Sequence, residues 1–180
     1  MQAMRFKVGR FGAFLATRNK GAKVREDLER QMRGLAGGDV VEISFARVEA
    51  VTVSFADEFI GKLFALAREE DGPGTALLLR DLNDEVREAV SISLERRGAA
   101  AVARRSKQFE ILGGDRYLAE TYVQARALGE FRAGDLAKAV GITPQNANNR
   151  LRRLVDAGAL LRVRTAPQRG GKEFLYRVPI

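Results

Sequence analysis

The chain has 180 residues, of which 46% are apolar and 30% charged, enough to bury a core in one domain or two small ones. Its formal net charge is +8 and its pI is near 10.3, which favours an anionic partner, nucleic acid first. The sequence has no Cys and no His, which excludes thiolate nucleophiles, imidazole catalysis, disulfides and nearly all zinc sites.

The first residues, MQAMRFKVGRFGAFLATR, contain Arg5, Lys7 and Arg10, which interrupt any apolar run and predict no signal peptide. No stretch of 18 apolar residues occurs, so we expect no membrane span and a cytoplasmic protein. The GGD and DGPG segments lack the glycine spacing of a nucleotide motif. We therefore expect no cofactor and no metal.

Helical and strand patterns alternate through the first hundred residues. The segment TRNKGAKVREDLERQMRGL has a helical stripe through Val24 and Leu28. We expect a strand over 40–45, an apolar helix over 54–69, a short buried strand over 75–80 and a helix over 83–98. This order predicts an α/β sandwich in which helices pack on a mixed sheet.

The order resembles the STAS domain of anti-sigma-factor antagonists, and more closely a STAS-like family of uncharacterised function often found with histidine-kinase-type ATPases. The segments that carry the resemblance are TRNKGAKVREDL, VVEISFARVEAVTVSFADEFIGKLF and LRDLNDEVREAV, and SFADE at residues 54–58 is the most specific. They cover about residues 5–100. The resemblance implies a STAS-like fold and a protein partner, with a histidine-kinase-type ATPase as the candidate.

Ser54 is the candidate regulatory residue, because the resemblance implies a phosphorylated Ser or Thr at the start of the helix after the second core strand. Thr52, two residues before it, is a second candidate for phosphorylation or partner contact. A phosphate there would meet free backbone N–H groups and the positive end of the helix dipole. Two roles stay open for Ser54: a phosphorylation or partner-contact site, or an N-cap that forms an approximate capping box with Asp57.

Asp57 and Glu58 are adjacent carboxylates on a helix and should point about 100° apart, so we expect them not to face one shared site. Both would repel a phosphate on Ser54. Four cations near the start of the preceding helix form either a surface for an anionic partner or a solvated basic face: Arg18, Lys20, Lys23 and Arg25.

Positive charge concentrates toward the end of the chain. Residues 115–180 hold 12 Lys/Arg against 6 Asp/Glu, a net charge of +6, whereas residues 1–114 hold 19 against 17, a net charge of +2. Gly113 and Gly114 form a local breaker near the changeover. We therefore predict a STAS-like domain over residues 1–105, a linker over 106–114 and a second domain over 115–180.

The second domain has the pattern of a helix, a short helix, a turn, a longer helix and a hairpin. The segment RAGDLAKAVGIT predicts the short helix, with a positive φ at Gly141. Thr143 suits the N-cap of the longer helix, and Pro144 suits its first position. Strands over 160–165 and 173–178 flank a basic turn.

This order resembles the winged helix-turn-helix of bacterial transcription regulators, an α+β fold. DLAKAVGIT matches the second helix and turn, PQNANNRLRRLVDAGAL the recognition helix, and LRVRTAPQRGGKEFLYRV the wing. The resemblance covers about residues 116–180. It implies double-stranded DNA as the partner.

The predicted recognition helix has an apolar face through Ala147, Leu151 and Leu154, and a cluster of amides elsewhere. Asn is a poor helix former, but Asn and Gln can pair with adenine through two hydrogen bonds, and Arg can pair with guanine. The DNA-binding residues expected here are Thr143, Gln145, Asn146, Asn148, Asn149, Arg150, Arg152 and Arg153.

In the wing, Arg164, Arg169 and Lys172 flank two glycines and suit contacts with phosphates or the minor groove. The alternative is an ordinary charged hairpin without a ligand.

Two functions stay open. In the first, the chain is a DNA-binding transcriptional regulator whose STAS-like domain binds a regulatory protein. In the second, it is an interaction adaptor in a partner-switching system with a kinase-type ATPase, and the winged helix binds protein. A homodimer is compatible with both. Without His or Cys, no nucleophile–base–orienter set is visible, so we expect no enzyme and no catalytic residues.

Overall fold

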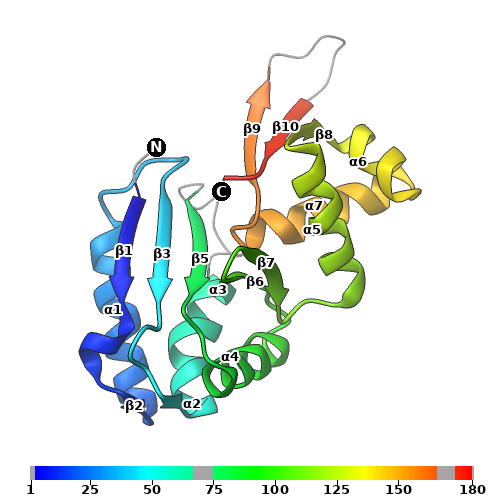
Figure 1. Cartoon of the computed structure of the whole chain (residues 1–180). Helices are drawn as coiled ribbons and strands as arrows, with labels where there is room; N and C mark the ends of the chain where they lie inside the picture. The colour runs from blue at the N-terminus through cyan, green and yellow to red at the C-terminus, as the bar shows by residue number, and fades with distance from the viewer. Residues whose placement is uncertain (1–2, 67–74, 166–172, 180) are drawn as a thin grey trace.

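Figure 1 shows a computed structural model of the protein, which describes residues 3–66, 75–165 and 173–179. Its centre is a five-stranded sheet of order β1-β3-β5-β6-β7. The strands are β1 (Ala3–Lys7), β3 (Val40–Ser44), β5 (Ala76–Arg80), β6 (Ala101–Arg105) and β7 (Gln108–Leu112). β1, β3, β5 and β6 run parallel, and β7 is antiparallel to β6. The fold is therefore mixed α/β with a mostly parallel sheet.

The helices of the N-terminal part cover one face of this sheet. Parallel neighbours need crossover connections, and a helix supplies them between β1 and β3 and between β5 and β6. The elements are α1 (Arg18–Met32), α2 (Val53–Ala56), the π-helical turn η2 (Asp57–Gly61), α3 (Lys62–Leu66) and α4 (Asp84–Arg96). Shorter elements are the 3₁₀ turn η1 (Val8–Phe11) and the paired strands β2 (Phe14–Leu15) and β4 (Ala50–Val51).

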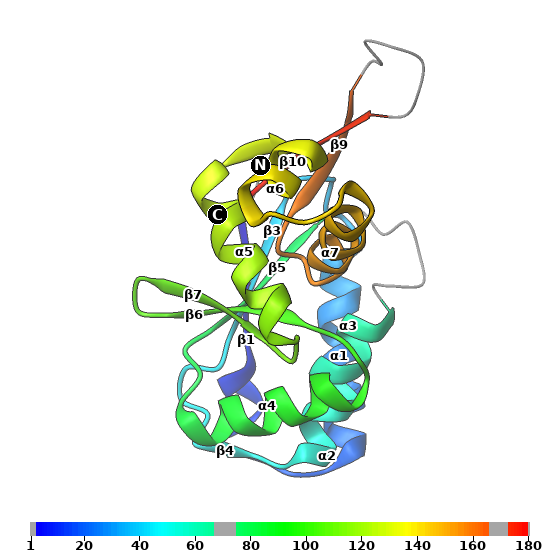
Figure 2. The same ribbon diagram turned by 90° about the vertical axis from the view of Figure 1, so that its right-hand side faces the viewer.

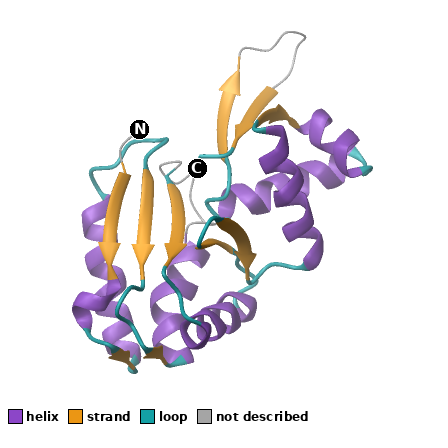
Figure 3. Cartoon of the chain, in the orientation of Figure 1, coloured by secondary structure: helices purple, strands orange, loops and turns teal. Residues whose placement is uncertain are grey.

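The C-terminal part contains three helices and a second, antiparallel sheet of order β8-β10-β9. Strands β9 and β10 extend away from the five-stranded sheet (Figure 3). The elements are α5 (Arg116–Leu128), β8 (Glu130–Arg132), α6 (Ala133–Val140), α7 (Pro144–Asp156), β9 (Leu161–Thr165) and β10 (Glu173–Arg177). None of the helices within the described ranges is long and apolar enough to cross a membrane.

Strand β5 connects two hydrophobic cores, because successive side chains of a strand point to opposite faces of a sheet. Leu77 and Leu79 belong to the core formed with α1 to α4. Leu78 belongs to the second core, together with Val102 of β6 and Leu118 of α5. The C-terminal part therefore packs against the second face of the same sheet at β5 and β6 (Figure 2). A strand buried on both faces explains the continuous apolar run ALLL.

A close backbone contact joins the end of α7 to the sheet. Gly158 has φ +67°, and a Cβ on it would lie 2.8 Å from the backbone nitrogen of Leu77. Val40, Ala76 and Leu161 form a small buried cluster where β3, β5 and β9 begin. The segment that follows α7 is thus packed directly against β5 and β3.

The structure confirms most of the predicted elements and changes two of them. The strands expected over 40–45 and 75–80 and the helix over 83–98 are β3, β5 and α4. The helix expected over 54–69 begins at Val53 and is interrupted by η2. The predicted linker over 106–114 contains β7. The apolar pattern of this segment is too short to predict a strand, and its pairing with β6 makes it one. The sequence pattern also does not predict β1, β6 and β8.

Candidate functional site

Helix α7 begins at a defined cap. Gly141 adopts the left-handed conformation (φ 70°, ψ 40°) at the end of α6, which a residue without Cβ does without strain. The Oγ1 atom of Thr143 accepts a hydrogen bond from the Asn146 backbone N–H (3.3 Å), and Pro144 occupies the first helical position. The predicted turn, cap and first residue are confirmed, and they fix where the first turn of α7 lies.

One side of α7 is buried in the second core. Ala147, Leu151 and Leu154 are fully buried, together with Leu118 of α5 and Leu136 of α6. Residues three and four positions apart share a helix face. This packing therefore turns the polar side of α7 outward.

The amides of the first turns lie on the exposed side of α7. Gln145, Asn146, Asn148 and Asn149 are all exposed. The Nε2 atom of Gln145 donates to Oδ1 of Asn149, and Nε of Arg150 donates to Oδ1 of Asn146, each at 3.2 Å. Exposed hydrogen bonds of this kind contribute little and exchange readily with other partners. The surface thus presents a row of donors and acceptors to a ligand.

Two arginines of α7 have different surroundings. Arg152 is exposed and has no ion-pair partner in the part of the chain that the structure describes. Arg150 donates to Oγ1 of Thr121 (3.0 Å), and its guanidinium lies 5.4 Å from the centroid of the Tyr117 ring. Arg150 therefore holds α7 against α5, and Arg152 stays free to meet a ligand.

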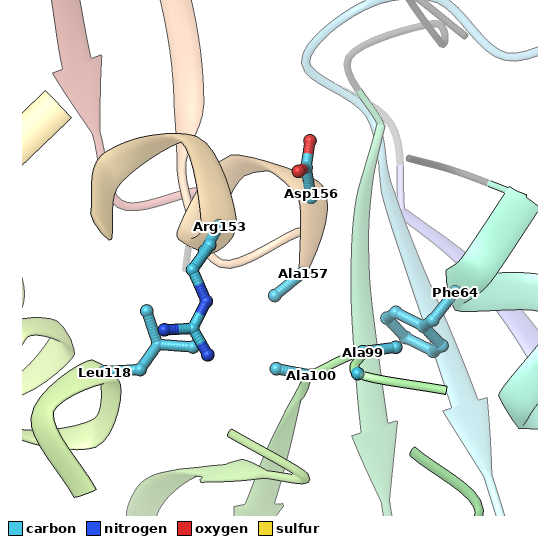
Figure 4. A pocket seen from close by; sticks show the side chains of 8 residues that line it. Phe64, Ala99, Ala100, Leu118, Arg153, Asp156 and Ala157 are labelled. Atoms are coloured by element: carbon cyan, nitrogen blue, oxygen red, sulfur yellow. The ribbon is translucent and has the colours of Figure 1, made fainter. Parts of the chain in front are cut away.

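Arg153 turns toward the start of α5. Its Nη1 atom lies 2.6 Å from Oδ2 of Asp115, the N-cap residue of α5, and this contact lowers the pKa of the Asp115 carboxyl. Figure 4 shows Arg153 beside Leu118 at a cavity of about 20 Å³. The cavity lies between α3, α7 and the segment that joins α4 to β6. That volume suits about one water molecule. The sequence places Arg153 on the polar face, whereas the structure shows it linking two helices.

The hairpin residues expected to contact DNA are only partly described. Arg169 and Lys172 lie outside the described residues. Arg164 belongs to β9, where it pairs with Phe174 of β10. Sequence reasoning missed Arg162, whose guanidinium lies 4.6 Å from the centroid of the Phe174 ring. Its two-residue spacing from Arg164 in a strand is the signal that could have identified it.

A second candidate site lies at the start of α2. The N-cap is Thr52, whose Oγ1 accepts from the Phe55 N–H (3.2 Å) and donates to the carbonyl oxygen of Ala16. The interpretation of Ser54 as the N-cap is therefore wrong, because the N-cap of this helix is Thr52, two residues earlier. Ser54 is half-buried, and its hydroxyl has no hydrogen-bond partner among the residues that the structure describes.

Asp57 and Glu58 share a cation. The Nη1 atom of Arg18 lies 3.4 Å from Oδ2 of Asp57 and 3.2 Å from Oε1 of Glu58, and both carboxylates are largely buried. The expectation that they do not face one site is wrong. They lie in the π turn η2, where the geometry differs from that of an α-helix, and the long Arg18 side chain reaches both from α1.

Three more cations complete this arrangement. Arg97 donates twice to Asp57 (2.7 and 2.9 Å) and lowers the pKa of that carboxyl. Lys62 lies 2.7 Å from Glu58 and lowers the pKa of Glu58, and Arg25 donates to the Glu58 carbonyl oxygen (2.8 Å). We call these six residues the charged cluster: Arg18, Arg25, Asp57, Glu58, Lys62 and Arg97.

The charged cluster depends on a close approach of α1 to η2. A Cβ on Gly21 would lie 2.7 Å from the carbonyl oxygen of Phe55 and 2.9 Å from Cβ of Glu58. Arg18 and Arg25 therefore point toward η2, whereas Lys23 is exposed. The four cations of α1 do not form one solvated basic face.

Comparison with known families places this second site in a recognised segment. The model of the STAS-like domain of unknown function (DUF4325) matches residues 20–71. No curated protein and no solved structure matches the chain. The matched segment runs from α1 through α3 and contains Thr52, Ser54 and four members of the charged cluster: Arg25, Asp57, Glu58 and Lys62. Residues 20–71 thus match a STAS-like family model.

Proposed function

We propose that residues 115–180 form a winged helix-turn-helix that binds double-stranded DNA, with α7 in the major groove. The observation that carries the proposal is the exposed amide row of α7, Gln145 to Asn149, on a helix whose other side is fully buried. A face that served only solubility would use Glu and Lys, which favour a helix more than Asn does. Amides at these positions suit direct reading of adenine edges.

The cations of α7 take separate roles in this proposal. Arg152 is exposed and unpaired among the described residues, so it is the phosphate contact on α7. Arg150 and Arg153 are held by α5 through Thr121 and Asp115. They orient α7 rather than meet phosphates. The net charge of +8 adds the general attraction to DNA that positions a basic protein before bases are read.

The test compares one amide with one arginine on a preferred site, chosen by selection from random duplexes. Asn149→Ala should cost about 1–3 kcal/mol on that site and little on random DNA, because base contacts specify. Arg152→Ala should weaken both by similar factors and reduce the salt slope by roughly one unit. Arg96→Ala, an exposed cation on α4, is the charge-matched control and should change neither. A folded protein that binds no duplex at about 50 mM salt would eliminate the proposal and favour the adaptor.

The STAS-like part is proposed to bind a regulatory protein near Ser54. The supporting observation is a half-buried hydroxyl without a hydrogen-bond partner among the described residues, in the matched segment. Asp57 and Glu58, which would repel a phosphate here, are each paired with cations of the charged cluster. Phosphorylation of Ser54 therefore meets less repulsion than the sequence suggests.

The corresponding experiment is a pull-down from the native cell with three forms of the chain. Ser54→Glu should weaken or redirect the binding of a partner, while Ser54→Ala, which adds no charge, should keep it. Circular dichroism checks that both variants fold. If the wild type and Ser54→Glu recover the same proteins in the same amounts, Ser54 has no regulatory role.

A further inference from the structure

Strand β7 is an edge of the five-stranded sheet, and an open groove runs beside it. Among the described residues, the sheet order ends at β7, which pairs with β6 on one side and with no strand on the other. The groove between β7 and the outer side of α4 has a volume of about 600 Å³. Ile92 and Ile111 line it with apolar surface, and Gly113 and Gly114 leave one end without side chains. An edge strand presents unpaired N–H and C=O groups that another strand can pair with.

The groove is acidic along its α4 side. Glu88 and Glu95 line it, are exposed, and have no ion-pair partner in residues 3–66, 75–165 and 173–179. Arg87 does not offset them, because it is bound to Glu110 of β7 (Nε to Oε1, 2.9 Å). The segment that fills this groove therefore carries positive charge.

The tip of the β6–β7 hairpin is basic. Arg105 and Lys107 are exposed on either side of Ser106, which turns the chain with φ +57°. Figure 2 shows the hairpin reaching outward beyond α5. Among the described residues, the ion-pair partner of Arg105 is Asp84, at 3.4 Å, and both side chains are mostly exposed. The tip is thus available to an acidic surface on another molecule.

The basic tip and the Glu95 end of the acidic groove lie at opposite ends of β7. The start of α4 lies by the hairpin tip, through the Asp84–Arg105 contact. The end of α4 lies by the end of β7, where an added Cβ on Gly113 would come within 2.3 Å of Leu94 Cβ. An antiparallel pairing of β7 with a second β7 brings the tip of each copy to the Glu95 end of the other. Both contacts form at once, as a two-fold interface requires.

We propose that two copies of this chain associate through β7, forming a continuous sheet across a two-fold axis, with the basic hairpin tip of each copy in the acidic groove of the other. The proposal goes beyond DNA binding and does not depend on it. It assigns β7 and the outer side of α4 as the interface, and a second copy as the occupant of the groove.

A charge-swap experiment tests the arrangement by sedimentation of the full chain without DNA. Variant A carries Glu88→Lys and Glu95→Lys, and variant B carries Arg105→Glu and Lys107→Glu. Wild type should have twice the mass of one chain. Each variant alone should sediment as a monomer, because its groove and its tip then have the same sign. An equimolar mixture should regain the dimer mass, because each tip again meets a groove of opposite sign.

The outcomes decide the proposal. Circular dichroism and melting temperature should match wild type in both variants, since all four side chains are exposed and contribute little to the fold. The proposal is overturned if wild type is monomeric throughout a dilution series, or if both variants still form dimers. It is also overturned if both variants are monomeric and their mixture is monomeric too, because the hairpin tip of one copy would then not contact the groove of the other.

Discussion

Thr52 and Ser54 lie two residues apart at the start of α2, and only Thr52 satisfies the helix end. Thr52→Ala should lower the free energy of unfolding by about 1 kcal/mol, the usual loss for an N-cap. Ser54→Ala is the matched control and should change it by less than about 0.5 kcal/mol, because its hydroxyl has no partner among the described residues. Urea unfolding of both variants measures the difference. Equal losses of unfolding free energy in the two variants would mean that Ser54 stabilises the helix start as much as Thr52 does.

Asp57 makes stability depend on pH. Arg97 lowers the pKa of the Asp57 carboxyl in the folded state. A group with a lowered folded pKa stabilises the protein above its unfolded value, about 3.9 for Asp, and loses that contribution as the pH falls through the folded pKa. Asp57→Asn should therefore lower the unfolding free energy at pH 7 by about 2 kcal/mol, in the range for hydrogen bonds to charged groups.

The gap between wild type and Asp57→Asn should narrow as the pH falls below about 4, because the unfolded chain then binds a proton at Asp57 while the folded carboxylate, whose pKa is lowered, still stays charged. Urea unfolding at pH 7 and at pH 3 gives the comparison. Asp84→Asn is the control, since the Asp84 side chain is 85% exposed and its loss should matter little at either pH. A gap that stays constant between the two pH values would contradict the role of the Asp57 charge.

At the scale of elements, the glycines on either side of α7 allow the cost of backbone strain to be measured apart from the cost of a steric clash. Gly141 and Gly158 both have positive φ, but only Gly158 touches the five-stranded sheet. Gly141→Ala should cost about 1–2 kcal/mol for the left-handed conformation alone. Gly158→Ala should cost a further 1–3 kcal/mol or so, because its Cβ would press on the backbone of Leu77. Equal losses in urea unfolding would mean that the end of α7 can move away from β5.

The sequence predicts a helix or strand well where its cap residues or its apolar periodicity depend only on neighbouring residues. Gly141, Thr143 and Pro144 each act on their own neighbours, so the start of α7 can be read from the sequence. The π turn η2 cannot, because it spans only the five residues Asp57–Gly61, which is too short a stretch to show a change in the helical period. Strands β6 and β7 are only five residues long, and β6 takes its place in the sheet by pairing with the distant strand β5.

The candidate site residues likewise fall into those that local patterns predict and those that depend on contacts between distant segments. The exposed amides of α7 are predictable, because burial of Leu151 and Leu154 fixes the opposite face. The partner of Arg153 is not, since Asp115 is 38 residues away and meets it only through the packing of α5 on α7. The charged cluster likewise joins α1, η2 and the end of α4. Contacts between elements need the packing angle, which periodicity does not contain.

At the scale of the whole molecule, the two cores meet at the sheet. Leu78 and Val102 contribute to the C-terminal core from strands whose other face belongs to the N-terminal core. Loss of the C-terminal part would therefore expose apolar surface of the sheet. We expect the described parts to unfold as one cooperative unit, although the shift in charge after residue 114 suggests two separate domains.

Two single-tryptophan reporters test this cooperativity, because the chain has no Trp of its own. Phe11→Trp reports on the first core and Phe174→Trp on the second, and both positions are only partly buried and so tolerate the larger ring. Their urea midpoints should coincide. Val90→Ala, which removes buried methyl groups from the first core only, should lower the stability seen by both reporters by about 2 kcal/mol. If Phe174→Trp keeps its midpoint while Phe11→Trp shifts, the two parts fold independently.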